Sequence, residues 1–225
     1  MKITFLGHAS FLIEIENIKI IVDPFISRNP LAKDINLAAL NADFILVTHA
    51  HEDHMADVEI IAKASDAIVV SNFEIVSYFE KLGIKGHPMN HGGTWEFDFG
   101  KVTYTNAVHS SSFPDGSYGG NPGGFLIQAK HKNMYIAGDT SLTMDMKLIP
   151  LKAKLDVAIL PVGDNFTMGV DDAIIASDFL ECSKIIGCHF DTFGYIEINH
   201  EEAIKKFYDK NKDLMLLKIG EDIQL

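Results

Sequence analysis

The stretch from His49 to His54, which reads His-Ala-His-Glu-Asp-His, constrains this chain more than any other feature. It follows the apolar run 44–48, which predicts a short buried strand. After it, Met55, Val58 and Ile61 recur at helical spacing. The stretch is therefore expected at a turn from a strand into a helix.

Three imidazoles and a carboxylate in this turn are the donor types that zinc and similar metals bind. Residues two apart in an extended backbone point to the same side, so His49 and His51 can bind one ion. Asp53 and His54 can turn toward a second ion where the helix begins. A catalytic site of this kind leaves one coordination position for water. The alternative is a solvated acidic loop with some histidines. Four ligand-type side chains within six residues favour the metal site over this alternative.

Composition narrows the functional class. The chain has 225 residues, 47% of them hydrophobic and 22% charged, which is typical of a globular protein with a sizeable core. Its formal net charge of −12 argues against nucleic acid as a partner, because a polyanion would be repelled. No secretory signal and no apolar run of membrane-spanning length is visible, and two cysteines are too few for a disulfide framework. These features predict a cytoplasmic protein without membrane attachment.

Six predicted strands each end at a side chain that can bind a metal. In layered α/β folds, ligands gather beyond the strand ends, so these six side chains are expected to converge. Any one of them alone would more often be an ordinary hydrogen-bonded residue. The six are His8, Asp23, His49, His109, Asp139 and His189.

The remaining periodicity predicts a single domain over 1–225 that alternates strands and helices. Helices are expected over 55–64, 72–82, 145–151, 171–181 and 200–211, with a closing strand over 214–219. The segment from His109 to Gly124 is rich in serine, glycine and proline, and a loop of this length is expected to be a lid, a binding loop or disordered. Its paired glycines are interpreted as a flexible loop, because no Walker-type lysine follows them.

The order of the candidate metal-binding residues and their positions at strand ends closely resemble the metallo-β-lactamase superfamily over almost the whole chain. The HxHxDH signature begins at His49, and the Gly-Asp-Thr motif surrounds Asp139. Within the superfamily, the chain is similar to the small stand-alone metal-dependent hydrolases related to ascorbate-phosphate lactonases. The residues that carry this closer similarity are Leu6 to Phe11, His109 to Ser111, Asn165 to Gly169, and Asp172-Ala173.

The resemblance implies an α/β fold, a four-layer αββα sandwich, with a dinuclear metal site at one edge. One ion would be bound by His49, His51 and His109. The other would be bound by Asp53, His54 and His189, with Asp139 bridging the two. His8 would lie beside the ions, with Asp23 and Thr140 supporting the ligands. Cys188 stands where the family pattern leads us to expect proline, and it is either a further ligand or a small buried residue.

The chemistry of this ligand set predicts a metal-dependent hydrolase. Two divalent ions, with zinc favoured and manganese, iron or nickel as alternatives, would leave about one surplus positive charge after Asp53, Asp139 and a bridging hydroxide are counted. Such a site suits a small ester, lactone or phosphoester attacked by metal-bound hydroxide, and its surplus charge suits an anionic substrate or an oxyanion-like transition state. Asp53 would orient the hydroxide, and His8 or a metal-bound water would protonate the leaving group.

Three other functions stay open at this point. A non-catalytic metal-dependent binding or sensor domain would keep the same ligands. A diiron redox module would be expected to carry a carboxylate in place of His51 and a flavin domain, and this chain has neither. A nuclease is disfavoured by the negative charge and the lack of a basic arm.

The expected partner is a small-molecule substrate, and a homo-oligomer is left open. Residues on loops near the proposed site could shape the substrate pocket, although core or lid packing would explain each equally well. The main candidates are Asn165, Phe166, Met168 and Tyr195, followed by Phe113, Tyr118 and Phe193.

Overall fold

Two seven-stranded sheets form the centre of the computed structural model, which describes residues 1–225. The first sheet has the order β14 (Asp222–Gln224), β1 (Lys2–Gly7), β2 (Ser10–Ile15), β3 (Ile18–Val22), β4 (Phe44–Leu46), β5 (Ile68–Asn72) and β6 (Gly86–Met89). The second has the order β13 (Asp213–Met215), β12 (Lys184–Cys188), β11 (Val157–Pro161), β10 (Asn133–Ile136), β9 (Gly123–Gln128), β8 (Gly100–Asn106) and β7 (Thr94–Phe97).

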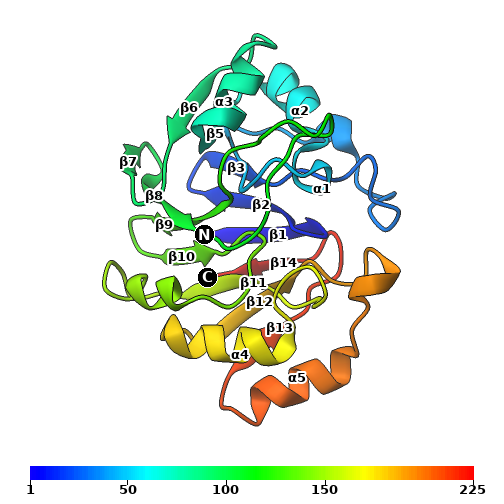
Figure 1. Ribbon diagram of the computed structural model, residues 1–225, viewed down its shortest axis with the longest axis vertical. Helices are drawn as coiled ribbons and strands as arrows, with labels where there is room; N and C mark the ends of the chain where they lie inside the picture. Colours follow the sequence, from blue (N-terminus) through cyan, green and yellow to red (C-terminus); the bar gives the residue numbers. More distant parts are fainter.

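Helices cover the outer face of each sheet. Figure 1 shows α2 and α3 at one end of the molecule and α4 and α5 at the other, with the strands of both sheets between them. None of the helices combines the length and the apolarity that crossing a bilayer requires. The bounds are α1 Glu52–Met55, α2 Val58–Ser65, α3 Phe73–Glu80, α4 Val170–Phe179 and α5 His200–Tyr208, with 3₁₀ turns η1 Leu37–Ala39, η2 Met144–Leu148 and η3 Gly194–Ile196.

Three apolar cores separate these layers. Central strands such as β4 and β11 are apolar and buried on both faces because both faces are covered. In β4, Phe44 and Leu46 face the core between the sheets, whereas Ile45 faces the core beneath the helices. A third core lies between the second sheet and α4 and α5. The arrangement confirms the predicted four-layer αββα sandwich.

Strand direction brings the predicted ligand positions to one edge. In the first sheet, β1 and β3 are both antiparallel to β2, and β4 is parallel to β3. In the second, β8 and β10 are both antiparallel to β9, and β11 and β12 run parallel to β10. The carboxyl ends of β1, β3 and β4 therefore share an edge of the first sheet, and those of β8, β10, β11 and β12 share an edge of the second.

Several boundaries differ from those predicted. The helix expected over 55–64 is α2, which begins only at Val58, whereas Met55 ends the short helix α1. Between them, the Asp57 carboxylate accepts hydrogen bonds from the backbone N–H groups of Ile26 and Ser27 at 2.6 and 2.9 Å. The segment expected to be a helix over 145–151 is the 3₁₀ turn η2. The closing strand over 214–219 is wrong as well. The chain leaves the second sheet after Met215 and pairs β14 with β1 in the first.

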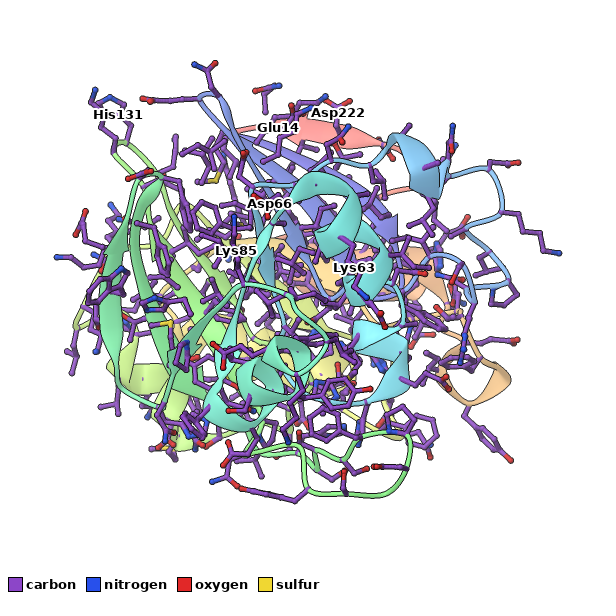
Figure 2. All side chains as sticks on the ribbon, turned by 90° about the horizontal axis from the view of Figure 1, so that it is seen from above. Glu14, Lys63, Asp66, Lys85, His131 and Asp222 are labelled. Carbon is purple, nitrogen blue, oxygen red and sulfur yellow. The ribbon has the colours of Figure 1, made fainter.

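Surface side chains behave as ordinary solvated groups. His131 lies at the turn between β9 and β10 and points away from the molecule, and Lys85 lies next to Asp66 (Figure 2). On the first sheet, the Lys2 ammonium lies 3.2 Å from Glu14 and 3.9 Å from Asp222, so it joins three neighbouring strands. Exposed ion pairs of this kind contribute at most about 1 kcal/mol each.

The loop over 110–124 is packed against the molecule, contrary to the flexible loop expected from its composition. The Ser111 hydroxyl accepts a hydrogen bond from Ala50 N–H at 3.1 Å and donates one to the Gly119 carbonyl at 3.0 Å. Asn72 donates to the same carbonyl at 3.0 Å, and Phe113 is buried against Tyr78. The loop thus supports the backbone of the His49–His54 turn.

We expect Gly119→Ala to destabilise the protein by about 1–3 kcal/mol, the usual effect of overpacking. A Cβ at Gly119 would lie 2.3 Å from the Ala50 Cβ, which is fully buried and cannot move aside alone. Urea unfolding measures the change. Gly194→Ala is the matched control, since its Cβ would meet nothing within 4 Å. Equal unfolding free energies for the two variants would contradict this packing.

Candidate metal centre

Three side chains from each sheet meet where the two strand edges come together. His8, Asp23 and His49 follow β1, β3 and β4, and the second sheet supplies the other three after β8, β10 and β12. The sheets are joined there by a hydrogen bond from the His189 N–H to the His8 carbonyl at 2.8 Å. The predicted convergence of His109, Asp139 and His189 on the His49–His54 turn is therefore present in the structure.

His49, His51 and His109 form the first ligand group. One nitrogen of each lies within 4.8 Å of the others. His49 Nε2 and His51 Nδ1 are 2.9 Å apart, and both point toward the same space. This is the trio that the resemblance places on one ion, although binding itself stays a prediction.

Asp53, His54 and His189 form the second group, and His8 joins them as a fourth potential ligand. His8 Nε2 donates a hydrogen bond to Asp53 Oδ2 at 3.1 Å, and its Nδ1 lies 2.9 Å from the Thr192 hydroxyl. The His8 side chain is fully buried, whereas 27% of the Asp53 side chain is exposed. Of this pair, only Asp53 reaches the solvent-accessible side of the site.

Asp139 lies between the two groups. Its Oδ2 atom is 3.6 Å from Nε2 of His109 and 3.9 Å from that of His49, both in the first group. On the other side it is 3.3 Å from Nε2 of His54 and 3.1 Å from that of His189. One carboxylate oxygen therefore faces both groups, as a bridging ligand would.

Asp23 orients one ligand of each group from behind. Its buried carboxylate accepts hydrogen bonds from His54 Nδ1 at 2.9 Å and from the Thr48 hydroxyl at 2.7 Å. Because that hydroxyl uses its hydrogen on Asp23, it accepts from His49 Nδ1, which is 3.0 Å away. In their neutral forms, both imidazoles therefore carry the proton on Nδ1 and leave Nε2 available to bind a metal.

Electrostatics in the site follow from burial and from this clustering. Burial holds the pKa of His49 well below its ordinary value and lowers the pKa of His8 to about 4. Burial also opposes charge on His54, but the carboxylates of Asp139, Asp53 and Asp23 outweigh it and raise the pKa of His54 well above normal. Burial likewise opposes ionisation of Asp139, yet the neighbouring His54 and His189 hold its pKa well below normal. The site thus keeps its carboxylate charged.

The residues fit divalent metal ions. His54 Nε2, which lies 3.3 Å from Asp139 Oδ2, is a buried side-chain atom without a hydrogen-bond partner in the protein. Unpaired buried polar atoms are rare and costly, so this atom indicates a ligand at this position. Imidazole and carboxylate donors are the set that zinc, manganese, iron and nickel accept.

Unusual backbone conformation accompanies the site. His8, Asp23 and His189 have φ values of 57°, 43° and 55°, in the left-handed region that side chains other than glycine seldom adopt. Each of these residues directly follows a strand, and its left-handed conformation changes the direction of the chain at the edge of the sheet. Local strain of this kind concentrates at functional sites, where the surrounding fold maintains it.

Two other residues, Thr140 and Cys188, were predicted to lie near the metal ligands. The Thr140 hydroxyl accepts from Val108 N–H at 3.0 Å, and the Thr140 carbonyl accepts from Met168 N–H at 3.0 Å, so Thr140 holds the segments beside His109 and Phe166. Cys188 lies in the core between the sheets and belongs to none of the ligand groups. Burial raises the pKa of its thiol well above normal, so the structure favours the small buried residue over a further ligand.

A pocket of about 250 Å³ opens onto the ligands. Phe166 lines it, as predicted, together with Phe193 and Ser110. Phe193 was among the further candidates named from the sequence, whereas Ser110 was not predicted to line the pocket, although it directly follows His109. The remaining residues that line the pocket belong to the two candidate ligand groups and to the site between them: His51, Asp53, His109, Asp139 and His189.

Three predicted substrate-binding residues do not line this pocket. Met168 is fully buried in the core under α4, where its apolar side chain packs. Asn165 and Tyr195 line a separate surface cavity beside α4 and α5, and Tyr195 touches Phe166 only from outside, with ring centroids 6.2 Å apart. The other two candidates also lie outside the lining, since Phe113 is buried in the core and Tyr118 is exposed.

Residues 2–189 match the model of the β-lactamase superfamily domain. This chain belongs to that superfamily. Members named UPF0173 metal-dependent hydrolases include one from Flavobacterium johnsoniae, 70% identical, and one from Christiangramia forsetii, 66% identical, each aligned over all of both chains. A solved structure of a metallo hydrolase from the archaeon Ignicoccus hospitalis is 31% identical to this chain with a TM-score of 0.90, over 99% of this chain and 97% of that one.

Proposed function

We propose that this protein is a metal-dependent hydrolase that uses two divalent ions, with zinc favoured, on a small-molecule ester, lactone or phosphoester. The observation that carries the proposal is the position of Asp139 Oδ2, within 3.1–3.9 Å of one nitrogen from four histidines in two groups. The names of the close relatives support the metal-dependent hydrolase class. Two ions, their identity and the substrate are our inference.

Bound at these two groups, divalent ions would supply Lewis acidity and lower the pKa of a water molecule toward ~7. His49, His51 and His109 would hold one ion, and Asp53, His54 and His189 the other, with Asp139 between them. Asp23 would fix the tautomers of the ligands it contacts. These roles follow from the hydrogen bonds already described.

Asp53 is the group placed to orient the attacking water. Its carboxylate is partly exposed on the pocket side and is held by the hydrogen bond from His8. His8 itself is buried, does not line the pocket, and has a pKa of about 4 because of burial. A neutral, covered imidazole is a poor proton donor to a leaving group, so we assign His8 a positioning role through Asp53. This differs from the proton-donor role expected from the sequence.

Metal analysis and turnover together test this function. We expect purified, reloaded protein to hold close to two transition-metal ions per chain. We also expect hydrolysis within a panel of lactones and p-nitrophenyl phosphodiesters assayed with zinc, manganese, iron or nickel. A chelator should abolish turnover and added metal should restore it. Full metal loading with no turnover across the panel would instead support a binding or sensor domain, and a coloured, redox-active protein would support a diiron module.

A further inference from the structure

The pocket over the ligands is small. Its volume of about 250 Å³ lies below the roughly 300–1,000 Å³ of sites that enclose drug-sized ligands. Its lining consists of metal-binding side chains, one hydroxyl from Ser110, and the two aromatic rings of Phe166 and Phe193. A substrate that fills this pocket must be compact. The surface available to the non-reacting part of the substrate is mainly aromatic.

Phe166 is held out over the pocket by a tight turn after β11. Asp164 and Asn165 both have left-handed φ values, 62° and 55°. The Asp164 N–H donates to the Met168 carbonyl at 3.1 Å, and Met168 is anchored in the core. The turn therefore presents a ring that is 50% exposed beside the ligands, at a position where burial in the protein does not require an aromatic residue.

Phe193 is fixed from behind. Its ring packs edge-on against His8, with centroids 5.4 Å apart, and lies 6.3 Å from the ring of Phe25. One side of Phe193 thus covers the buried His8, while 36% of the residue stays exposed in the pocket. Two rings from the loops after β11 and β12 are therefore available to a ligand.

No lysine or arginine lines the pocket. The single arginine of the chain, Arg28, is exposed and paired with Glu52. Enzymes that select phosphate or carboxylate groups usually place such cations around them, because charge-assisted hydrogen bonds carry the recognition. With two divalent ions bound, the surplus charge of about +1 could attract an anion, but the protein supplies no further partner for one.

We propose, resting on the hydrolase function above, that the substrate is a small uncharged ester or lactone whose short apolar or aryl substituent lies against Phe166 and Phe193. Phosphoesters are poor substrates on this proposal. The reaction adds one water molecule. The water oxygen bonds to the carbonyl carbon, the bond from that carbon to the leaving oxygen breaks, and a proton from the water ends on the leaving oxygen. No oxidant or reductant takes part.

A lactone series isolates the substituent. We compare γ-butyrolactone with its γ-phenyl and γ-carboxylate derivatives, and with phenyl phosphate, on metal-loaded protein whose ion content is measured in each sample. Contact of a phenyl group with one aromatic ring strengthens binding by about twofold to tenfold, and two rings face this pocket. We therefore expect kcat/KM for the phenyl lactone to exceed that for the unsubstituted lactone by about fivefold to tenfold, mainly through KM. The carboxylate lactone and phenyl phosphate should fall below both.

Variants identify the rings responsible. Phe166→Ala and Phe193→Ala should each remove most of the phenyl advantage, measured as the ratio of kcat/KM for the phenyl lactone to kcat/KM for the unsubstituted lactone, whereas Phe166→Leu should keep part of it. Tyr208→Ala is the matched control, because Tyr208 is an exposed aromatic residue of α5 outside the pocket. Preference for either anionic compound, or a phenyl advantage that survives both alanine variants, would overturn the proposal.

Binding provides a readout that does not depend on turnover. Phenylacetohydroxamate should bind the metal-loaded protein about fivefold to tenfold more tightly than acetohydroxamate by calorimetry, and Phe166→Ala should remove the difference. If neither the lactones nor phenyl phosphate are hydrolysed with both ions bound, the hydrolase function is wrong. The two hydroxamates would still test whether the pocket binds an aromatic group. Equal affinities would overturn the aromatic site. So would a dimer in light scattering that Phe166→Ala dissociates, since the ring would then serve subunit contact.

Discussion

Asp139→Ala should lose at least one of two bound divalent ions and reduce kcat/KM by about three orders of magnitude or more. The carboxylate that faces both histidine groups is the only acidic side chain between them, and its Oδ2 atom lies 3.1 Å from His189 Nε2 and 3.6 Å from His109 Nε2. Losing a catalytic ion removes several kcal/mol of transition-state stabilisation, and each 1.36 kcal/mol is tenfold in rate. Metal analysis after dialysis and steady-state kinetics measure the two effects.

Asp115→Ala is the matched control for this prediction. Asp115 is an exposed aspartate of the 110–124 loop whose carboxylate bonds only to Ser117 within that loop. It should keep both ions and full activity. If Asp139→Ala retains the metal content of the unchanged protein, then Asp139 does not bridge, and the two groups must be held together by other residues.

The second large effect is expected for Asp23→Asn, which should weaken metal binding by about 10–100-fold, the usual consequence of altering a group behind a metal ligand. The amide oxygen can still accept from the Thr48 backbone N–H, which now donates to Oδ1 at 2.8 Å. Its NH₂ would then replace Oδ2, which now accepts from His54 Nδ1 at 2.9 Å and from the Thr48 hydroxyl at 2.7 Å. His54 would then favour the tautomer with a proton on Nε2, the atom that must bind the metal. Competition with a fluorescent chelator measures the affinity.

Folding should distinguish this mechanism from general damage. Asp23→Asn keeps the shape of a fully buried side chain, so circular dichroism should be unchanged. Asp23→Ala should also destabilise the protein by about 3 kcal/mol, because buried donors lose their acceptor. Asp43→Asn makes the same chemical change at an exposed carboxylate that accepts from Lys19 N–H, and it should leave the metal affinity unchanged. A similar loss of affinity in Asp43→Asn would remove the tautomer explanation.

The site could be predicted from sequence because its residues follow recognisable strands. Apolar runs end at His8, Asp139 and His189, and strands of like direction bring their ends to one edge whatever the details of the loops. Sequence could not show that His8 would be covered by Phe193. That contact joins segments 185 residues apart and depends on how two loops pack, which local periodicity does not record.

The substrate-binding residues were harder to predict for a related reason. Asn165, Phe166 and Met168 are neighbours in sequence, yet two successive left-handed residues turn them to three different environments: a surface cavity, the pocket and the core. Asparagine and aspartate tolerate that conformation, so the turn leaves only a weak sequence signal. Similarly, β6 contains Gly86, His87 and Pro88, which do not resemble a strand, and it forms because β5 offers its edge.

Each sheet supplies only part of the ligand set, and this division links metal binding to assembly of the whole molecule. A partly folded chain with only the first sheet formed would hold the His49–His54 turn but lack His109, Asp139 and His189. Cations would then bind such an intermediate more weakly than the finished protein, so their binding energy favours the state in which the two halves are docked. The ions would stabilise the interface between the two sheets. Metal depletion would therefore weaken this interface before either sheet itself unfolds.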